Sequence, residues 1–154
     1  MKYQTRNEFE HFTYEEARIG DVERLGSIFH LWLDNAGILP ENSCNRDIRK
    51  MRCNAMCFKI LDASIVKLVE EGYRYYDANG KLLREDPDRE LAPLEYADRL
   101  ALLREGWIVS FERKTQEEGF LYTLAADGSD EKTYCITISG SGDEQEWDRF
   151  LSLE

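Results

Sequence analysis

Short segments of this chain alternate apolar and polar residues and end in turn signals, and this pattern restricts the fold more than any other feature. In residues 27–33 (SIFHLWL) one face would carry Phe29, Leu31 and Leu33, and in residues 53–61 (CNAMCFKIL) one face would carry Met56, Phe58 and Ile60. Successive side chains point to opposite faces of a β-strand, so a period of two indicates a strand with a buried face. We therefore predict a strand in each segment.

The second half of the chain predicts three more strands, in residues 107–114, 119–126 and 133–139. Polar stretches with glycine, residues 116–119 and 127–130, lie between them and predict hairpin loops. Strands joined by such short loops pair in antiparallel fashion.

Residues 73–85 (YRYYDANGKLLRE) predict a further hairpin, because the pair Asn79-Gly80 tolerates the positive φ angles of a tight turn. This string is similar to the YD repeats of bacterial Rhs proteins. It occurs once, so the resemblance implies hairpin chemistry alone. Residues 85–92 predict a flexible polar connector.

Residues 63–71 (ASIVKLVEE) allow two interpretations. Asp62 could cap a helix that Gly72 closes. The β-branched residues and the tyrosines that follow favour a long strand, which is our prediction.

Two helices complete the predicted architecture. Pro93 suits the first turn of a middle helix, in which Leu94 and Leu100 would face inward before Gly106 ends it. A short C-terminal helix is indicated by the capping-box spacing of Asp143 and Glu146, with aromatic and aliphatic residues on one face: Trp147, Phe150 and Leu151. The predicted fold class is α+β, mostly antiparallel β, as a sandwich or curved sheet, in a single domain over residues 1–154.

The charge balance limits the partners. Lys and Arg number 20 against 31 Asp and Glu, a formal net charge of −11. This argues against nucleic acid and anionic membranes as partners and permits a basic protein. The amino terminus has no apolar signal region, and no stretch approaches the roughly 18 apolar residues of a membrane span, so we expect a cytoplasmic location with free thiols.

Three of the four cysteines and four basic residues fall within residues 42–57 (NSCNRDIRKMRCNAMC). On one strand Cys53 and Cys57 would share a face about 13 Å apart, too far to bind one metal ion together. We therefore expect no metal or cofactor, while a site built from His30, Cys44 and Cys53 stays open as an alternative.

Two charged groups are candidate contact sites. The basic run consists of Arg46, Arg49, Lys50 and Arg52, and with Asp47 its local charge is +4 − 1 = +3. It could contact an anion or a partner, or be a solvated connector. Residues 127–154 hold eight acids against two bases, a net charge of −6, and the candidate acidic partner face is Asp143, Glu144, Glu146 and Trp147. The alternative for this face is a docked helix whose aromatic residues belong to the core.

No catalytic constellation emerges. The chain has two histidines, His11 and His30, and no nucleophile-elbow motif. Residues 139–144 (SGSGDE) lack the lysine of a phosphate loop and place two acids where a phosphate would bind.

Three segments, residues 42–45 (NSCN), 70–80 (EEGYRYYDANG) and 146–150 (EWDRF), give the chain a resemblance to small proteins of clostridial-type gut bacteria. That group carries no established function, so the resemblance implies no catalytic residue. The acidic single-domain composition is similar to that of immunity proteins of bacterial toxin systems.

Two functional hypotheses follow. The first is a non-enzymatic cytoplasmic protein-interaction module that binds, and could inhibit, a basic protein. The alternative is a small-ligand or metal-dependent enzyme.

Overall fold

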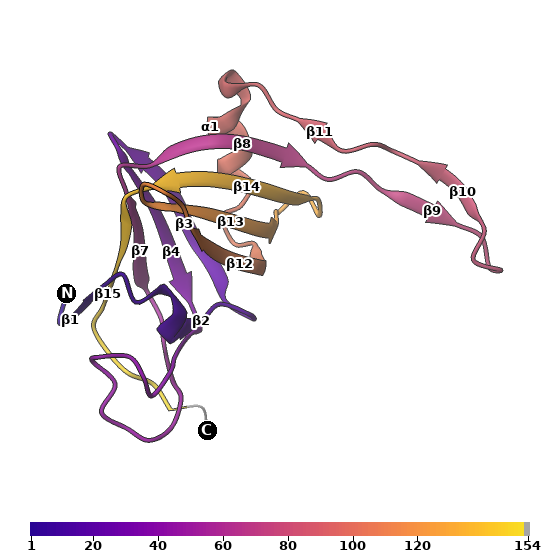
Figure 1. Cartoon of the computed structure of the whole chain (residues 1–154). Coiled ribbons are helices and arrows are strands. Elements are labelled where there is room, and N and C mark those ends of the chain that lie inside the picture. Colours follow the sequence, from indigo (N-terminus) through magenta and orange to yellow (C-terminus); the bar gives the residue numbers. More distant parts are fainter. Residues whose placement is uncertain (153–154) are drawn as a thin grey trace.

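The chain forms one large open sheet of ten antiparallel strands in the computed structural model, which describes residues 1–152 (Figure 1). Their order is β1, β15, β7, β4, β3, β12, β13, β14, β8, β11. The first five are β1 (Tyr3–Arg6), β15 (Gly142–Trp147), β7 (Met56–Leu61), β4 (Ile28–Asp34) and β3 (Arg18–Leu25). The other five are β12 (Trp107–Thr115), β13 (Phe120–Asp127), β14 (Thr133–Gly140), β8 (Ser64–Glu70) and β11 (Arg89–Glu90). The predicted mostly antiparallel β class is therefore confirmed.

Smaller elements surround this sheet. A three-stranded sheet holds β2 (Phe12–Thr13), β5 (Ala36–Ile38) and β6 (Met51–Cys53), and a two-stranded sheet holds β9 (Arg74–Tyr76) and β10 (Leu82–Glu85). The helical elements are the 3-10 helices η1 (Phe9–His11) and η2 (Pro93–Glu95) and the helix α1 (Tyr96–Ala101). No helix within residues 1–152 combines the length and the apolar character that a membrane crossing requires.

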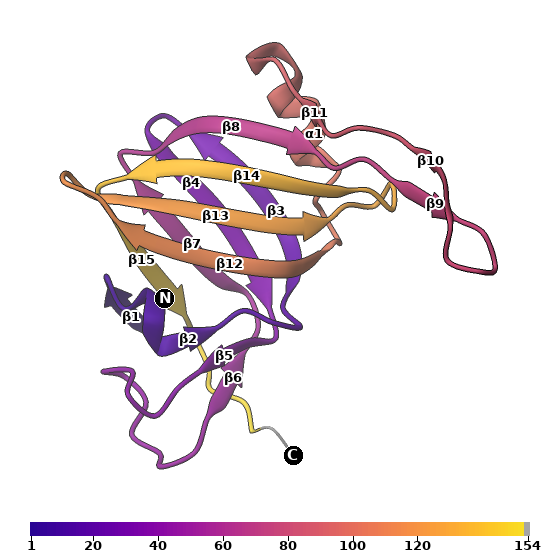
Figure 2. The same ribbon diagram turned by 45° about the vertical axis from the view of Figure 1, so that its right-hand side comes forward.

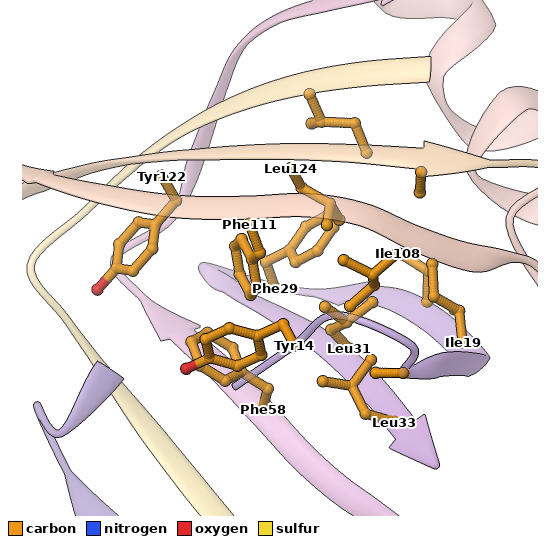
Figure 3. Packing of buried hydrophobic residues seen from close by; sticks show 14 of the residues in the cluster. Tyr14, Ile19, Phe29, Leu31, Leu33, Phe58, Ile108, Phe111, Tyr122 and Leu124 are labelled. Carbon is orange, nitrogen blue, oxygen red and sulfur yellow. The ribbon is translucent and has the colours of Figure 1, made fainter. Parts of the chain in front are cut away.

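The large sheet bends between β3 and β12, where a single residue pair, Arg18 opposite Trp107, joins the two strands in the described chain. The bend places β3, β4, β7 and β15 across from β12, β13, β14 and β8 (Figure 2). Phe58 of the first half meets Phe111 of the second half at a ring-centroid distance of 5.1 Å, within the cluster of Figure 3. The core therefore fills the space between two halves of one curved sheet.

Two neighbouring connections carry the chain from one half of the sheet to the other. β7 leads into β8 through Asp62 (φ 48°), and β14 leads into β15 through Ser141. The Ser141 N–H donates to the Leu61 carbonyl over 2.8 Å, and its hydroxyl donates to the Asp62 carboxylate over 2.6 Å. A Cβ on Gly140 would lie 2.5 Å from the Ile60 side chain and 2.9 Å from the Leu61 carbonyl oxygen. Glycine at position 140 thus permits the close approach of the two connections.

Most predicted strands and hairpins are confirmed, including the strand interpretation of residues 63–71 as β8. The predicted strand at 53–61 instead begins at Met56, because the chain turns at Ala55 (φ 53°) and Cys53 ends the separate strand β6. The middle helix is confirmed but short, and Leu94 is 96 % exposed rather than inward-facing. Tyr96 and Leu100 supply its buried side chains.

The predicted C-terminal helix is wrong, because residues 142–147 form strand β15 between β1 and β7. After the buried Gly142, the buried positions are Asp143, Gln145 and Trp147, so the segment alternates at period two with polar residues inside. Asp143 and Glu146 have the spacing of a capping box, yet Asp143 makes its contacts within the core.

Asp143 is fully buried and is joined to both halves of the sheet. Its carboxylate accepts hydrogen bonds from Arg113 of β12 over 2.9 Å, from the Tyr122 hydroxyl of β13 over 2.6 Å, and from the Gln145 side-chain amide over 2.6 Å. Its backbone N–H donates to the Asn7 side chain over 2.9 Å. Burial and the hydrogen bond to Asp143 raise the pKa of Tyr122, so this hydroxyl remains a donor. We call these five residues the Asp143 network.

The Asp143 network generates the first prediction. Arg113→Met should lower the free energy of unfolding by about 3 kcal/mol, because it leaves a buried carboxylate without its charged partner. Adding Asp143→Asn should recover about 1 kcal/mol or more of this loss, since the uncompensated charge is then removed. Urea unfolding of the two single variants and the double variant measures the coupling. Simple additivity of the two losses would contradict this role for the pair.

Candidate functional site

A narrow two-stranded arm extends from the end of β8 and β11, away from the two halves of the sheet (Figures 1 and 2). We define the arm as residues 72–88. β8 and β11 pair through Glu70 opposite Arg89, and β9 and β10 continue the ribbon beyond them. The Asp86 N–H donates to the Tyr73 carbonyl over 2.7 Å and joins these two parts. The arm is thus a hairpin anchored at its base.

The base of the arm depends on a close backbone crossing at Gly72. A Cβ at this position would lie 1.8 Å from the Asp86 carbonyl oxygen, which leaves no space for any other residue. The Gly72 N–H donates to the Asp88 carboxylate over 2.8 Å. These contacts fix the direction in which the hairpin leaves the body.

The tip of the arm contains the predicted Asn79-Gly80 turn. Gly80 has a φ angle of 80°, and the Asp77 carboxylate accepts hydrogen bonds from the N–H groups of Asn79 and Lys81 over 2.8 and 2.9 Å. Aspartate at the start of a turn commonly bonds in this way. The hairpin prediction is therefore confirmed in its turn as well as in its strands.

The arm carries large apolar side chains that are exposed to solvent. Their exposed fractions are 39 % for Tyr73, 41 % for Tyr75, 56 % for Tyr76, 45 % for Leu82 and 65 % for Leu83. An isolated two-stranded ribbon has no core, so such residues remain in water unless something covers them. Sequence reasoning used these residues only as evidence for strands. The neighbours Tyr75 and Tyr76 indicated more, because adjacent strand residues point to opposite faces and one core cannot bury both.

Carboxylates surround the tyrosines at the base of the arm. A hollow of about 590 Å³ is lined by two tyrosines, four acids and one base: Tyr73, Tyr76, Glu71, Glu85, Asp86, Asp88 and Arg74. Two of these acids are paired, Glu85 with Arg74 over 3.0 Å and Asp86 with Arg84 over 3.3 Å. Counting Arg84 with the lining, the net charge is −4 + 2 = −2. Tyrosine faces and carboxylates are both favourable neighbours for a lysine or arginine side chain.

Glu70 ties the root of the arm to the rest of the protein. Its carboxylate lies 3.2 Å from the Lys132 ammonium, 3.4 Å from the Arg89 guanidinium and 3.5 Å from the Arg99 guanidinium of α1. The Tyr134 hydroxyl lies 3.3 Å from the same carboxylate and donates its hydrogen bond to Asp130 over 2.5 Å. Burial alone would raise the pKa of Glu70, but Lys132, Arg99 and Arg89 outweigh it and lower that pKa below its usual value.

The predicted basic contact residues are not gathered into one site. Arg49 pairs with Asp47 over 3.4 Å, and the Arg52 guanidinium donates to the Ser152 carbonyl over 3.1 Å. Lys50 lies beside Gly37 and borders a different hollow from Arg46. Arg46 alone of the four lines the groove beside β1 and the end of the chain.

The predicted acidic partner face is not available as a unit. Asp143 and Trp147 are fully buried, because β15 turns them into the core. Glu144 pairs with Arg6 over 2.9 Å and Glu146 with Lys59 over 3.2 Å, so both remaining acids are already neutralised. Exposed acidic charge next to aromatic side chains lies instead at the base of the arm.

Cys53 and Cys57 have the character of core residues rather than nucleophiles. Burial raises the pKa of the Cys53 thiol to about 12 and that of Cys57 to about 11, so both stay protonated at neutral pH. His30, Cys44 and Cys53 do not meet, since residues 1–152 contain no cluster of three or more metal-ligating side chains. The structure therefore supplies no geometry for the predicted alternative metal site.

Comparison of the chain with known protein families, with curated proteins and with solved structures finds no match. The resemblance to proteins of clostridial-type gut bacteria stays a prediction.

The Glu70 contacts generate a pH-dependent prediction. The pKa of Glu70 is lower in the folded protein than its ordinary value of 4.5, so its stabilisation is complete above that value and is lost as the pH falls through the folded pKa. Glu70→Gln should lower the melting temperature at pH 7 and cost about 1–2 kcal/mol. The difference from wild type should shrink as the pH drops below 4. Glu118→Gln, in an exposed hairpin loop, is the control, and a pH-independent Glu70→Gln effect would contradict the assignment.

Gly72 generates a second prediction for this region. Gly72→Ala should force the strands apart at the base of the arm and raise amide hydrogen exchange in residues 73–86, while the body keeps its protection. Gly20→Ala is the matched control, because a Cβ there meets its neighbours at an ordinary 3.7 Å. Unchanged exchange in the arm of Gly72→Ala would show that the crossing tolerates a side chain.

Proposed function

We propose that this chain is a non-enzymatic protein-interaction module that binds a basic protein through the arm. The observation that carries the proposal is the set of exposed tyrosine and leucine side chains on residues 72–88, beside a hollow of net negative charge. A cytoplasmic location, and inhibition of the partner in the manner of an immunity protein, belong to the same proposal.

The chemistry of the arm supports a protein as the partner. Tyrosine gives a large contact area at a small cost in side-chain entropy and is enriched among the residues that dominate binding energy at protein interfaces. The arm offers such side chains on both of its faces, since Tyr75 and Tyr76 are adjacent in β9 and both are exposed. A partner with a cleft can therefore surround the arm rather than touch one side of it.

The charge supports a basic partner. The chain carries a net charge of −11, and the hollow at the base of the arm has four carboxylates against the guanidinium groups of Arg74 and Arg84. A negative field accelerates the encounter with a positively charged protein, and the effect weakens as salt screens it. Arg84 stacks on Tyr75 at 4.4 Å from the ring centroid, which shows that an arginine already fits the face of a tyrosine on this arm.

The alternative of a metal-dependent enzyme has no supporting observation in residues 1–152. The thiols of Cys53 and Cys57 are buried and protonated, and the fully buried carboxylate, Asp143, is saturated by hydrogen bonds within the core.

Capture experiments test the proposal by three criteria: the partner is basic, its binding depends on the arm, and high salt releases it. The double variant Tyr75→Ser/Leu83→Ser removes two exposed apolar side chains of the arm, and Val66→Ser is the matched control, because Val66 is 55 % exposed on β8 outside the arm. Wild type and the control should retain a basic protein from native lysate at low salt. The arm variant should bind it at least tenfold more weakly, and high salt should release it. A partner that the arm variant retains equally, or an acidic partner, would contradict the proposal, as would the absence of any salt-sensitive partner.

A further inference from the structure

At the end of the molecule away from the arm, β1, the loop of residues 39–50 and the last described residues come together (Figure 1). The side chains of these segments line a groove. Its volume is about 810 Å³, and it is lined by Tyr3, Cys44, Asn45, Arg46, Asp47, Ile48, Met51 and Phe150. The separation from the arm means that the function of this groove can be tested independently of the proposed arm interface.

Aromatic rings form one wall of the groove. Tyr3 and Phe150 meet edge to face at a centroid distance of 4.7 Å, and both pack on the buried Trp147, at 5.7 and 5.6 Å. Met51 extends this apolar surface, and Ile48 stands at the rim with 93 % of its area exposed. An apolar molecule that lies in the groove would cover side chains that otherwise face water.

The charge in the groove comes from Arg46. Within residues 1–152 its guanidinium has no hydrogen bond or ion pair, in contrast to Arg49 and Arg52 of the same run. The acid in the lining, Asp47, is already paired with Arg49 over 3.4 Å. In a protein of net charge −11, this corner therefore presents a free positive group to an occupant.

Two buried donors next to the groove lack acceptors. Among residues 1–152, the side-chain amide of Asn42 and the indole N–H of Trp147 find no hydrogen-bond partner, and the residues are 2 % and 0 % exposed. Asn42 accepts a hydrogen bond from the N–H of Cys44, and Trp147 packs on Tyr3, so each is in contact with a residue of the groove wall. Unpaired donors are costly, but neither residue lines the groove, so the anionic group of an occupant is assigned to Arg46 alone.

We propose that this groove binds a small apolar anion, an alkyl or aromatic molecule with one carboxylate or sulfonate group. Its apolar part lies on Tyr3, Met51 and Phe150, and its anionic group pairs with Arg46. A cation is disfavoured by Arg46, and a polyanion finds one unpaired guanidinium in the lining rather than a cluster.

A pair of dyes that differ by a single charge tests this proposal. The probes are 1-anilinonaphthalene-8-sulfonate and its uncharged parent, N-phenyl-1-naphthylamine, and binding is followed by dye fluorescence. Wild type should bind the sulfonate more tightly than the parent. Arg46→Glu should weaken sulfonate binding about tenfold and leave the parent unchanged. Phe150→Ser should weaken both dyes, and decanoate should displace the sulfonate.

Two controls separate this site from the rest of the surface. Arg24→Glu makes the same change in net charge at an exposed arginine that borders a different hollow, and it should leave both dyes unaffected. The variant Tyr75→Ser/Leu83→Ser should also bind as wild type does, so failure of the arm proposal would not affect this result. Equal binding of the two dyes, insensitivity to Arg46→Glu, or loss of sulfonate binding in the arm variant would overturn the proposal. If the protein forms a concentration-dependent dimer and Arg46→Glu makes it monomeric, the groove binds a second copy of the chain, and the small-anion proposal is overturned.

Discussion

The ion pair between Asp143 and Arg113 is the interaction on which the rest of the structure depends. The carboxylate is fully buried in one half of the bent sheet, and the guanidinium comes from the other half. A buried charge is tolerated only with a well-placed partner, so the two halves must meet at this point and in this register. Because side chains join the halves here, β3 and β12 can separate after the pair of Arg18 and Trp107 without opening the core. The same network holds the amino-terminal segment through Asn7.

The sequence predicts those strands whose buried positions are apolar and regularly spaced, such as β4, β7 and the run from β12 to β14. The sequence pattern does not predict β3, because a bulge at Gly20 shifts its register and the buried Ile19 and Val22 are three positions apart rather than two. β15 is mistaken for a helix because its inward positions include Asp143 and Gln145. Hydrophobic periodicity cannot detect a strand whose buried side chains are polar and are satisfied by partners distant in sequence.

The candidate surfaces show the same division between local and tertiary information. The turn of the arm follows from Asn79 and Gly80, which are local. The direction in which the arm projects does not follow from local residues, because it depends on where β8 stops pairing with β11 and on the crossing of Gly72 with Asp86. The basic run is contiguous in sequence, but the loop that contains it turns its side chains toward different neighbours. Only the fold shows that Arg46 lines the groove without an ion pair in residues 1–152, whereas Arg49 and Arg52 have partners.

Two separate surfaces thus lie on this chain, an aromatic and acidic arm and an apolar groove lined by Arg46. We propose that the partner binds at the arm. Hydrogen exchange of the chain, free and in complex with the captured partner, tests this claim most directly, because it reports on every segment at once. New protection from exchange should be concentrated in residues 72–88, and the exchange of residues 42–51 should be unchanged. Protection that appears on the body or at the groove, with the arm exchanging as in the free protein, would contradict it.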